Sequence, residues 1–163
     1  MLFRSTLRGL GGTGSSRSLV LADGLPLNDA FGGWVYWDKL PSAAVDRVEV
    51  LRGSGSDLYG ADAVGGVVQI LTRRPQRLAA QALADGGSLG TGRLSLFAGA
   101  RPRGWSYTAA SESFTTDGYV LVDRAQRGPI DARAGSTHRS LLATLGRHGD
   151  NGWHFEAGAK SEE

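Results

Sequence analysis

Residues 45–72 read VDRVEVLRGSGSDLYGADAVGGVVQILT. In the first eight positions apolar residues, mostly β-branched valine, alternate with charged ones. This pattern predicts a strand with one buried face. Gly53 and Gly55 end that strand, a turn or short helix is expected at residues 56–59, and a nearly all-apolar strand follows at residues 67–71. The stretch therefore predicts two strands joined by a compact, glycine-rich link.

The same stretch resembles the end of the plug domain of TonB-dependent outer-membrane receptors, whose pattern runs roughly ERVEVLRGP-S-LYG--A-GGVINIIT. The positions in register with that pattern are Arg47 to Gly53, Leu58-Tyr59-Gly60, Ala63 and Gly65-Gly66-Val67. Two departures are mild: Ser54 stands where the family usually has proline, and Gln69 where it usually has asparagine. A long match with several fixed spacings is a specific signal. The alternative is an unrelated soluble β-domain with a glycine-rich turn.

Composition limits the class of protein only loosely. A chain of 163 residues can hold one domain or two small ones. It has 25 glycines but only 5 prolines, which suits tight turns and close backbone packing more than disorder. The absence of cysteine excludes disulfides and thiolate metal sites. A net charge of +2 without a dominant basic cluster gives no support for a nucleic-acid partner.

Membrane and export signals are weak in this sequence. No run of about 18 apolar residues predicts a transmembrane helix, although a β-barrel crosses a membrane with strands of only about 9–11 residues. Met1 is not followed by the basic start and apolar core of a signal peptide. If the protein is a receptor of this family, its export signal is expected upstream of this chain.

The first third of the chain adds to the resemblance. Residues 9–14 fit the motif G-x-G-x-x-G. In a dinucleotide-binding fold a helix begins at this motif, whereas here polar residues and a predicted strand follow it. Nucleotide binding therefore has little support. Receptor plugs instead carry Arg-Gly, a loop and then LVLIDGVPLND. This chain has Arg8-Gly9 and, at residues 19–29, LVLADGLPLND. Asp23-Gly24 predicts a tight turn, because glycine accepts positive φ.

Four aromatic residues then fall within seven positions, beside Gly32 and Gly33: Phe31, Trp34, Tyr36 and Trp37. They are expected either to fill the core or to form an exposed platform at a loop tip. A short helix is expected at residues 40–45, with Pro41 at an early helical position. It leads into the strand that begins at residue 45.

A composition break at residues 72–77, with three arginines and a proline, predicts a domain boundary. We expect a partial plug domain at residues 1–75 and the first strands of an outer-membrane β-barrel at residues 76–163. In the second part apolar residues alternate with polar or small ones, as in Leu94, Leu96, Ala98 and Ala100, in Leu141, Ala143 and Leu145, and in Trp153, Phe155, Ala157 and Ala159. This fits lipid on one side and a polar lumen on the other, although a soluble antiparallel sheet shows the same alternation.

The predicted fold class is therefore an α+β plug module followed by antiparallel transmembrane β-barrel strands that form an incomplete barrel. The family's barrel has many more strands than the five or so expected here, and its plug begins with a segment that engages the energy-coupling protein. We expect this chain to be a fragment of such a receptor.

The resemblance implies binding and gated passage. A scarce substrate such as an iron–siderophore or cobalamin, a small metal chelate, binds above the plug, and a TonB-type energy-coupling complex of the inner membrane moves the plug. The expected location is the bacterial outer membrane, in contact with its lipid. The alternative is a non-energised outer-membrane binding or adhesin-type protein with a plug-like module.

Catalysis has no support in the sequence, so we expect no enzyme, no cofactor and no metal site. His138, His148 and His154 lack a carboxylate or serine at a spacing that fixes a triad or a metal site. The sequence does not name the substrate.

The candidate site residues form two groups. The expected substrate-facing residues are Arg8, Gly9, Phe31, Trp34, Tyr36 and Trp37, because arginine suits an anionic chelate and aromatics give rigid contact area. The expected charge contacts between plug and barrel are made by Arg47, Glu49 and Arg52. The alternative for these three charges is a solvated strand face.

Overall fold

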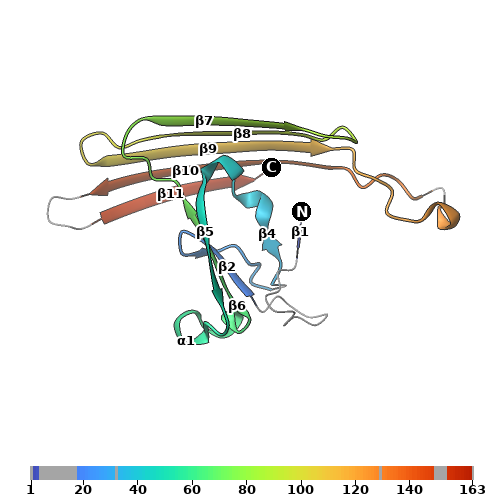
Figure 1. Cartoon of the computed structure of the whole chain (residues 1–163), viewed down its shortest axis with the longest axis horizontal. Helices are drawn as coiled ribbons and strands as arrows, with labels where there is room; N and C mark the ends of the chain where they lie inside the picture. The colour runs from blue at the N-terminus through green and yellow to red at the C-terminus, as the bar shows by residue number, and fades with distance from the viewer. Residues whose placement is uncertain (1, 4–17, 32, 129, 149–153, 163) are drawn as a thin grey trace. The chain divides into compact units, whose positions relative to one another are not determined.

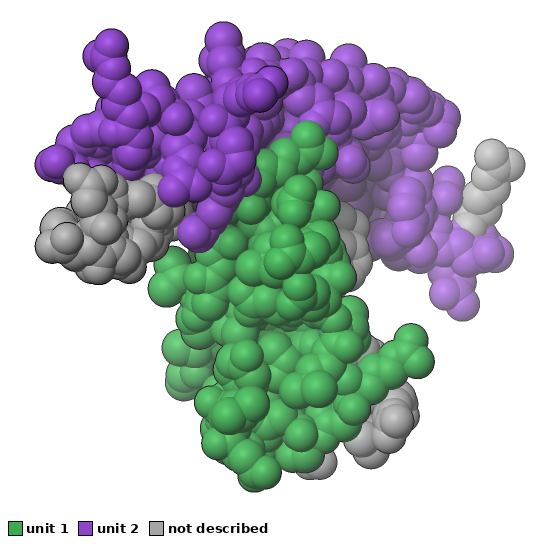
Figure 2. Space-filling view, turned by 60° about the vertical axis from the view of Figure 1, so that its left-hand side comes forward, with its two compact units in different colours: residues 1–39, 45–73 green, residues 40–44, 74–163 purple. Residues whose placement is uncertain are grey.

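The computed structural model describes residues 2–3, 18–31, 33–128, 130–148 and 154–162 (Figure 1). The chain divides into two compact units (Figure 2). Unit 1 consists of Met1–Lys39 and Val45–Arg73, and unit 2 of Leu40–Ala44 and Arg74–Glu163. Among the residues that the structure describes, no helix has the length and apolarity needed to cross a membrane.

Unit 1 is built on a four-stranded sheet with the order β3–β2–β6–β5. The parallel pair β2–β6 forms its centre, and the antiparallel neighbours β3 and β5 flank it. A separate two-stranded pair joins β1 and β4. The strands are β1 (Leu2–Phe3), β2 (Ser18–Ala22), β3 (Leu25–Pro26), β4 (Val35–Tyr36), β5 (Val45–Arg52) and β6 (Gly66–Thr72). The helices are η1 (Trp37–Lys39), α1 (Ser56–Tyr59) and η3 (Ala61–Ala63).

The tight turn expected at Asp23-Gly24 is confirmed. Both residues have positive φ, 47° and 83°, and Ala22 pairs with Leu25 across them. Two central residues with positive φ make the type I′ turn, whose twist matches that of the strands it joins. Asp and Gly tolerate this backbone conformation better than other residues, which explains why the sequence signal is reliable here.

The link between β5 and β6 folds back onto the sheet. Leu19, Leu21, Ala63 and Val67 form a buried cluster, so η3 covers the face on which β2 and β6 place these side chains. The Gly55 amide donates to the Ala63 carbonyl at 2.9 Å. A Cβ on Gly55 would lie 2.9 Å from the Val67 side chain, closer than real contacts allow, so this close approach requires glycine. The short helix expected at residues 56–59 is confirmed as α1.

The expected buried face of β5 is wrong. Val48, Val50 and Leu51 are 53%, 48% and 47% exposed, and from Asp46 onward every residue of the strand is exposed. The physical reason is that, among the described residues, no element covers either face of β5, and the buried cluster of the sheet contains residues of β2, β6 and η3 only. The helix expected at residues 40–45 is also shorter than predicted: it is the 3-10 helix η2 (Ser42–Ala44), and Val45 already belongs to β5.

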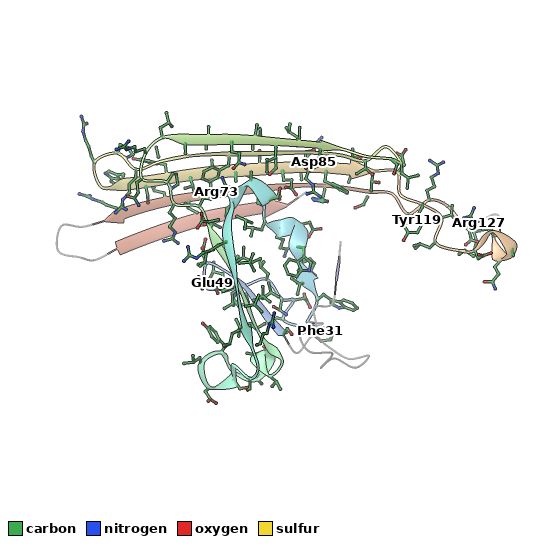
Figure 3. The ribbon with its side chains drawn as sticks, viewed as in Figure 1. Phe31, Glu49, Arg73, Asp85, Tyr119 and Arg127 are labelled. Atoms are coloured by element: carbon green, nitrogen blue, oxygen red, sulfur yellow. The ribbon has the colours of Figure 1, made fainter. Side chains whose placement is uncertain are left out.

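Unit 2 is an antiparallel meander in which each strand pairs with its neighbours in the sequence, in the order β7 to β11. A loop at residues 117–135, which contains the 3-10 helix η4 (Arg124–Gln126), extends beyond the sheet and carries Tyr119 and Arg127 (Figure 3). In the described residues β7 and β11 do not pair with each other, so the sheet is open. The strands are β7 (Ala79–Gly86), β8 (Gly92–Ala100), β9 (Trp105–Thr116), β10 (Ser136–His148) and β11 (His154–Glu162).

The two faces of this sheet differ in chemistry, as the alternation predicted. One face, named here the apolar face, exposes Leu94, Leu96, Tyr107, Leu141 and Leu145. The opposite face, named here the inner face, carries the buried residues Ser95, Phe97, Ala110, Glu112 and Ser140. The Leu40–Ala44 segment packs on the inner face, which explains why polar residues there are buried while leucines on the other face are exposed.

Candidate functional site

The aromatic segment after β3 is held by one aspartate. Asp29 accepts a hydrogen bond from the Phe31 amide at 3.0 Å and one from the Tyr36 hydroxyl at 3.4 Å. Its own amide donates to the Trp34 carbonyl at 2.6 Å. These bonds shape a compact turn that displays Phe31, which is completely exposed (Figure 3). The core interpretation therefore does not hold for Phe31.

The other aromatics of this segment are less exposed. Trp37 is 37% exposed, whereas Trp34 and Tyr36 are half-buried. The Lys39 ammonium lies 3.9 Å from the centroid of the Tyr36 ring, a cation–π contact. Arg8 and Gly9, the remaining residues expected to face substrate, lie outside the described residues.

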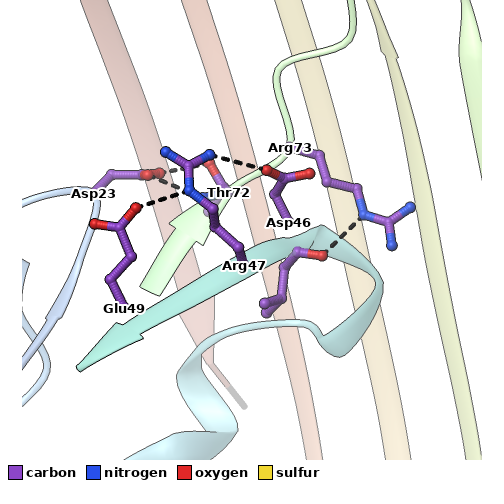
Figure 4. Close-up of polar contacts among 7 residues, drawn as sticks. Asp23, Asp46, Arg47, Glu49, Thr72 and Arg73 are labelled. Carbon is purple, nitrogen blue, oxygen red and sulfur yellow. Dashed lines mark hydrogen bonds and ion pairs between the residues drawn. The ribbon is translucent and has the colours of Figure 1, made fainter. Parts of the chain in front are cut away.

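The charges of β5 pair with one another (Figure 4). Arg47 donates to Glu49 at 2.8 Å and to Asp46 at 3.2 Å, and all three side chains are more than half exposed. The hydrogen bond to Glu49, followed by the one to Asp46, raises the pKa of Arg47 above its ordinary value. The strand pairing is irregular between Val45 and Arg47, as at a β-bulge. Arg52, at the far end of the strand, is exposed.

A second polar cluster closes the C-terminal end of β6, next to the Arg47 cluster (Figure 4). The Asp23 carboxylate accepts from the Thr72 amide at 3.0 Å and from the Thr72 hydroxyl. Arg73 Nε donates to the Val45 carbonyl at 2.9 Å. These bonds join the β2–β3 turn, the start of β5 and the end of β6. Sequence reasoning identified Asp23 only as a turn residue, because its partner lies 49 residues away.

Within unit 2, the Leu40–Ala44 segment is bound to the inner face of the sheet. The carboxylate of Glu112 accepts hydrogen bonds from both the amide, at 2.9 Å, and the hydroxyl of Ser42. Ser95 Oγ accepts from the Ala43 amide at 3.1 Å. Two successive backbone N–H groups of the segment are thus bound by side chains of β9 and β8. Sequence reasoning missed Ser42, Ser95 and Glu112.

Glu112 is 9% exposed and sits among groups that suit a carboxylate. Its second oxygen lies 3.9 Å from Nε2 of His138, whose ring stacks on Phe114 with centroids 5.0 Å apart. Burial of a carboxylate is costly unless hydrogen bonds replace its water, and the two donors of Ser42 supply them. The only available sequence signal is that Glu112 is the single acidic residue of β9. In the described part of the chain, no three His, Cys, Asp or Glu side chains are grouped to hold a metal.

Comparison with known proteins identifies the unit 1 motif. Residues 3–67 match the family model of the TonB-dependent receptor plug domain. Over 146 residues the chain is 32% identical to the vitamin B12 transporter BtuB of Photobacterium profundum, covering 87% of this chain and 23% of that protein. This chain belongs to the TonB-dependent receptor family. It spans about a quarter of the length of that relative.

Solved structures of TonB-dependent receptors share the fold. The ferric yersiniabactin uptake receptor FyuA of Yersinia pestis superposes with a TM-score of 0.68 at 21% identity, covering 99% of this chain and 26% of that one. The siderophore receptor PirA of Pseudomonas aeruginosa gives a TM-score of 0.64 at 27% identity, covering 95% and 27%. The plug module followed by open antiparallel strands is therefore the arrangement of a TonB-dependent receptor.

One segment of this receptor chain belongs to the plug by sequence and to unit 2 by structure. Leu40–Ala44 lies inside the range that matches the plug family, yet it groups with Arg74–Glu163 in the structure. The plug match also contains the aromatic segment and the charges of β5. All candidate residues predicted from the sequence, apart from those outside the described ranges, are therefore plug residues, whereas Ser95 and Glu112 belong to the strands that follow.

Proposed function

We propose that this chain works as the plug and first wall strands of an outer-membrane receptor that takes up a scarce substrate, cobalamin or a ferric siderophore. The observation that carries the proposal is the two-faced sheet that follows a plug module. Its exposed leucines suit lipid, and its polar inner face suits a wet lumen. Relatives named as a vitamin B12 transporter and as siderophore receptors support this choice of substrate class.

The proposed mechanism is binding followed by energised movement of the plug. In the full receptor a TonB-type complex of the inner membrane supplies the force, and no chemical step is catalysed. The plug suits this role because β5 is exposed from Asp46 onward, and Asp46, Arg47 and Glu49 pair with one another at its surface. A surface of this kind can shift in a wet lumen without exposing a large apolar core, which keeps the cost of movement low.

On the substrate side we assign the contact to Arg8, Gly9, Phe31, Trp34, Tyr36 and Trp37. The complete exposure of Phe31 supports this assignment, because an aromatic ring held in water by a structured turn offers contact area without an ordering cost. On the wall side we assign charge contacts to Arg47, Glu49 and Arg52. The division into a plug at residues 1–75 and barrel strands at residues 76–163 is part of the same proposal.

Uptake in cells tests the proposal. A receptor that carries this chain with the remaining barrel strands is expressed in bacteria lacking their own cobalamin and siderophore receptors. Cells are then supplied with radiolabelled cyanocobalamin or ferric enterobactin. We expect accumulation of one of them, which stops when the proton gradient is collapsed while surface binding persists. Binding without gradient-dependent accumulation would instead identify a non-energised binding protein.

A further inference from the structure

We infer that Leu40–Ala44 is a fixed part of the plug, which stays bound to the wall strands while the plug residues on either side of it move. Glu112 is the residue that positions this segment. The inference rests on the proposed function, since it assigns which part of the plug moves during uptake. We name the segment the wall anchor.

Hydrogen bonds to the backbone hold the wall anchor in place. The Ser42 amide is bound to Glu112 at 2.9 Å and the Ala43 amide to Ser95 at 3.1 Å, while the Ser42 hydroxyl adds a third bond to Glu112. The two acceptors lie on adjacent strands, β8 and β9, where Ser95 and Glu112 are register partners. The anchor is thus bound to two strands. A shift of the anchor along one strand also breaks its hydrogen bond to the other strand.

Close packing accompanies these bonds. Ala43 and Ala44 are buried against Phe97 and Ala110, with Leu142 at the edge of the cluster. The small side chains let the backbone of the anchor approach the sheet closely. Pro41 before them is also fully buried, so its fixed φ limits the conformations that the segment can adopt. By contrast, the side chains of β5 from Asp46 onward are exposed, and the strand pairs with β6 of its own unit.

The two ends of the wall anchor are suited to bending. Met1–Lys39 and Val45–Arg73 form one compact unit, and the five residues between them belong to the other. The strand pairing is irregular immediately after the anchor, between Val45 and Arg47. On the other side, η1 ends at Lys39, just before the anchor. Movement of unit 1 relative to a fixed anchor therefore requires backbone changes at these two junctions and at Arg73–Arg74, where unit 1 continues into the wall strands.

Release of the wall anchor is unfavourable because of Glu112. This carboxylate is nearly buried, and separation would remove both of its Ser42 donors. These hydrogen bonds are shielded from water, and release also exposes the packing of Ala43 and Ala44 on Phe97 and Ala110, whereas rearrangement of the exposed β5 charges breaks no buried contact. The wall anchor is therefore not the first part of the plug to detach, and force applied to the plug moves the rest of unit 1 first.

A disulfide lock tests the inference, and this chain contributes no cysteine that would compete with the introduced pair. Ala43→Cys and Ser95→Cys are combined in the full receptor, and the cross-link formed on oxidation is quantified by gel mobility. We expect the oxidised receptor to accumulate substrate within twofold of the reduced receptor, because the lock fixes a contact that does not open. A fall of fivefold or more, reversed by dithiothreitol and absent from both single variants, would overturn the inference. Lack of accumulation by the receptor without these substitutions would count against the proposed function instead.

Hydrogen exchange gives a second readout that does not depend on uptake. In the purified receptor, mixed with the periplasmic domain of TonB, we expect the amides of Ser42 and Ala43 to stay protected while amides of β5 exchange faster. Glu112→Gln should speed exchange at Ser42 at least tenfold. Ser113→Ala, on the opposite face of β9, serves as the matched control and should leave it unchanged. Loss of protection at Ser42 and β5 together would show that the anchor moves with the plug.

Discussion

Gly60 has φ 79° and ψ −168°, a backbone conformation that essentially only glycine adopts. It ends α1 and precedes η3, and a Cβ there would meet no atom within 4 Å. Gly60→Ala should therefore destabilise the plug through backbone strain alone, by about 1–3 kcal/mol. The measurement is the opening free energy of β6 amides from native-state hydrogen exchange. Asp62→Ala, at a nearby exposed position, is the control and should stay within about 0.5 kcal/mol.

Phe31 offers a test of substrate contact, because its ring is completely exposed and its loss removes no packing. Phe31→Ala should weaken substrate binding by about tenfold, corresponding to a contact of about 1.4 kcal/mol, and leave assembly and stability unchanged. Binding of cyanocobalamin or ferric enterobactin to isolated outer membranes measures this. Leu58→Ala removes another exposed apolar side chain of unit 1 and should have no effect. Equal affinities of all three receptors would remove Phe31 from the substrate site.

Among the elements, β5 carries two arginines with different surroundings. Arg47 is already paired with Asp46 and Glu49, whereas we expect exposed Arg52 to pair with a carboxylate of the barrel wall in the full receptor. Arg52→Ala should then cost about 3–5 kcal/mol if the pair is desolvated, since it leaves a charge without its partner. Asp57→Ala, at an exposed position of α1, is the control, because substitutions of exposed residues usually change stability by less than about 0.5 kcal/mol. Plug protection from hydrogen exchange is the readout, and an unchanged pattern in Arg52→Ala would contradict the expected contact.

The elements that could be predicted from the sequence are those with local causes. The Asp23-Gly24 turn, α1, and the strands β2, β6 and β8 follow from turn residues and periodicity within short windows. The exposure of β5 could not be predicted, because alternation shows that a strand has two faces but not whether another element covers either of them.

The candidate site was predictable only in part, for a similar reason. The aromatic segment and the charges of β5 stand out by composition. The Glu112–Ser42 and Ser95–Ala43 bonds join residues 70 and 52 positions apart, and neither serine nor a single glutamate in a strand signals its partner. The wall anchor therefore became visible only in the folded chain.

At the scale of the whole molecule, the open sheet of unit 2 predicts how the chain behaves by itself. Its leucine-bearing face is exposed, and in the described residues β7 and β11 have free edges. Without the remaining strands of a barrel and without detergent, the 163-residue chain should aggregate. Size-exclusion chromatography with light scattering checks this. A monodisperse monomer that unfolds cooperatively in plain buffer would contradict the assignment of these strands to a barrel.

The proposal as a whole depends on the sheet having lipid on its apolar face and water on its inner face. Thr108 and Ala109 are adjacent on β9, Thr108 on the inner face and Ala109 on the apolar face. Single cysteines at these two positions therefore report on opposite faces of the sheet. The direct measurement is labelling of Thr108→Cys and Ala109→Cys by a charged maleimide, in a cysteine-free full receptor in isolated outer membranes. We predict that position 108 reacts in the intact membrane and that position 109 reacts only after detergent is added. Rapid labelling of position 109 in the intact membrane would contradict the account.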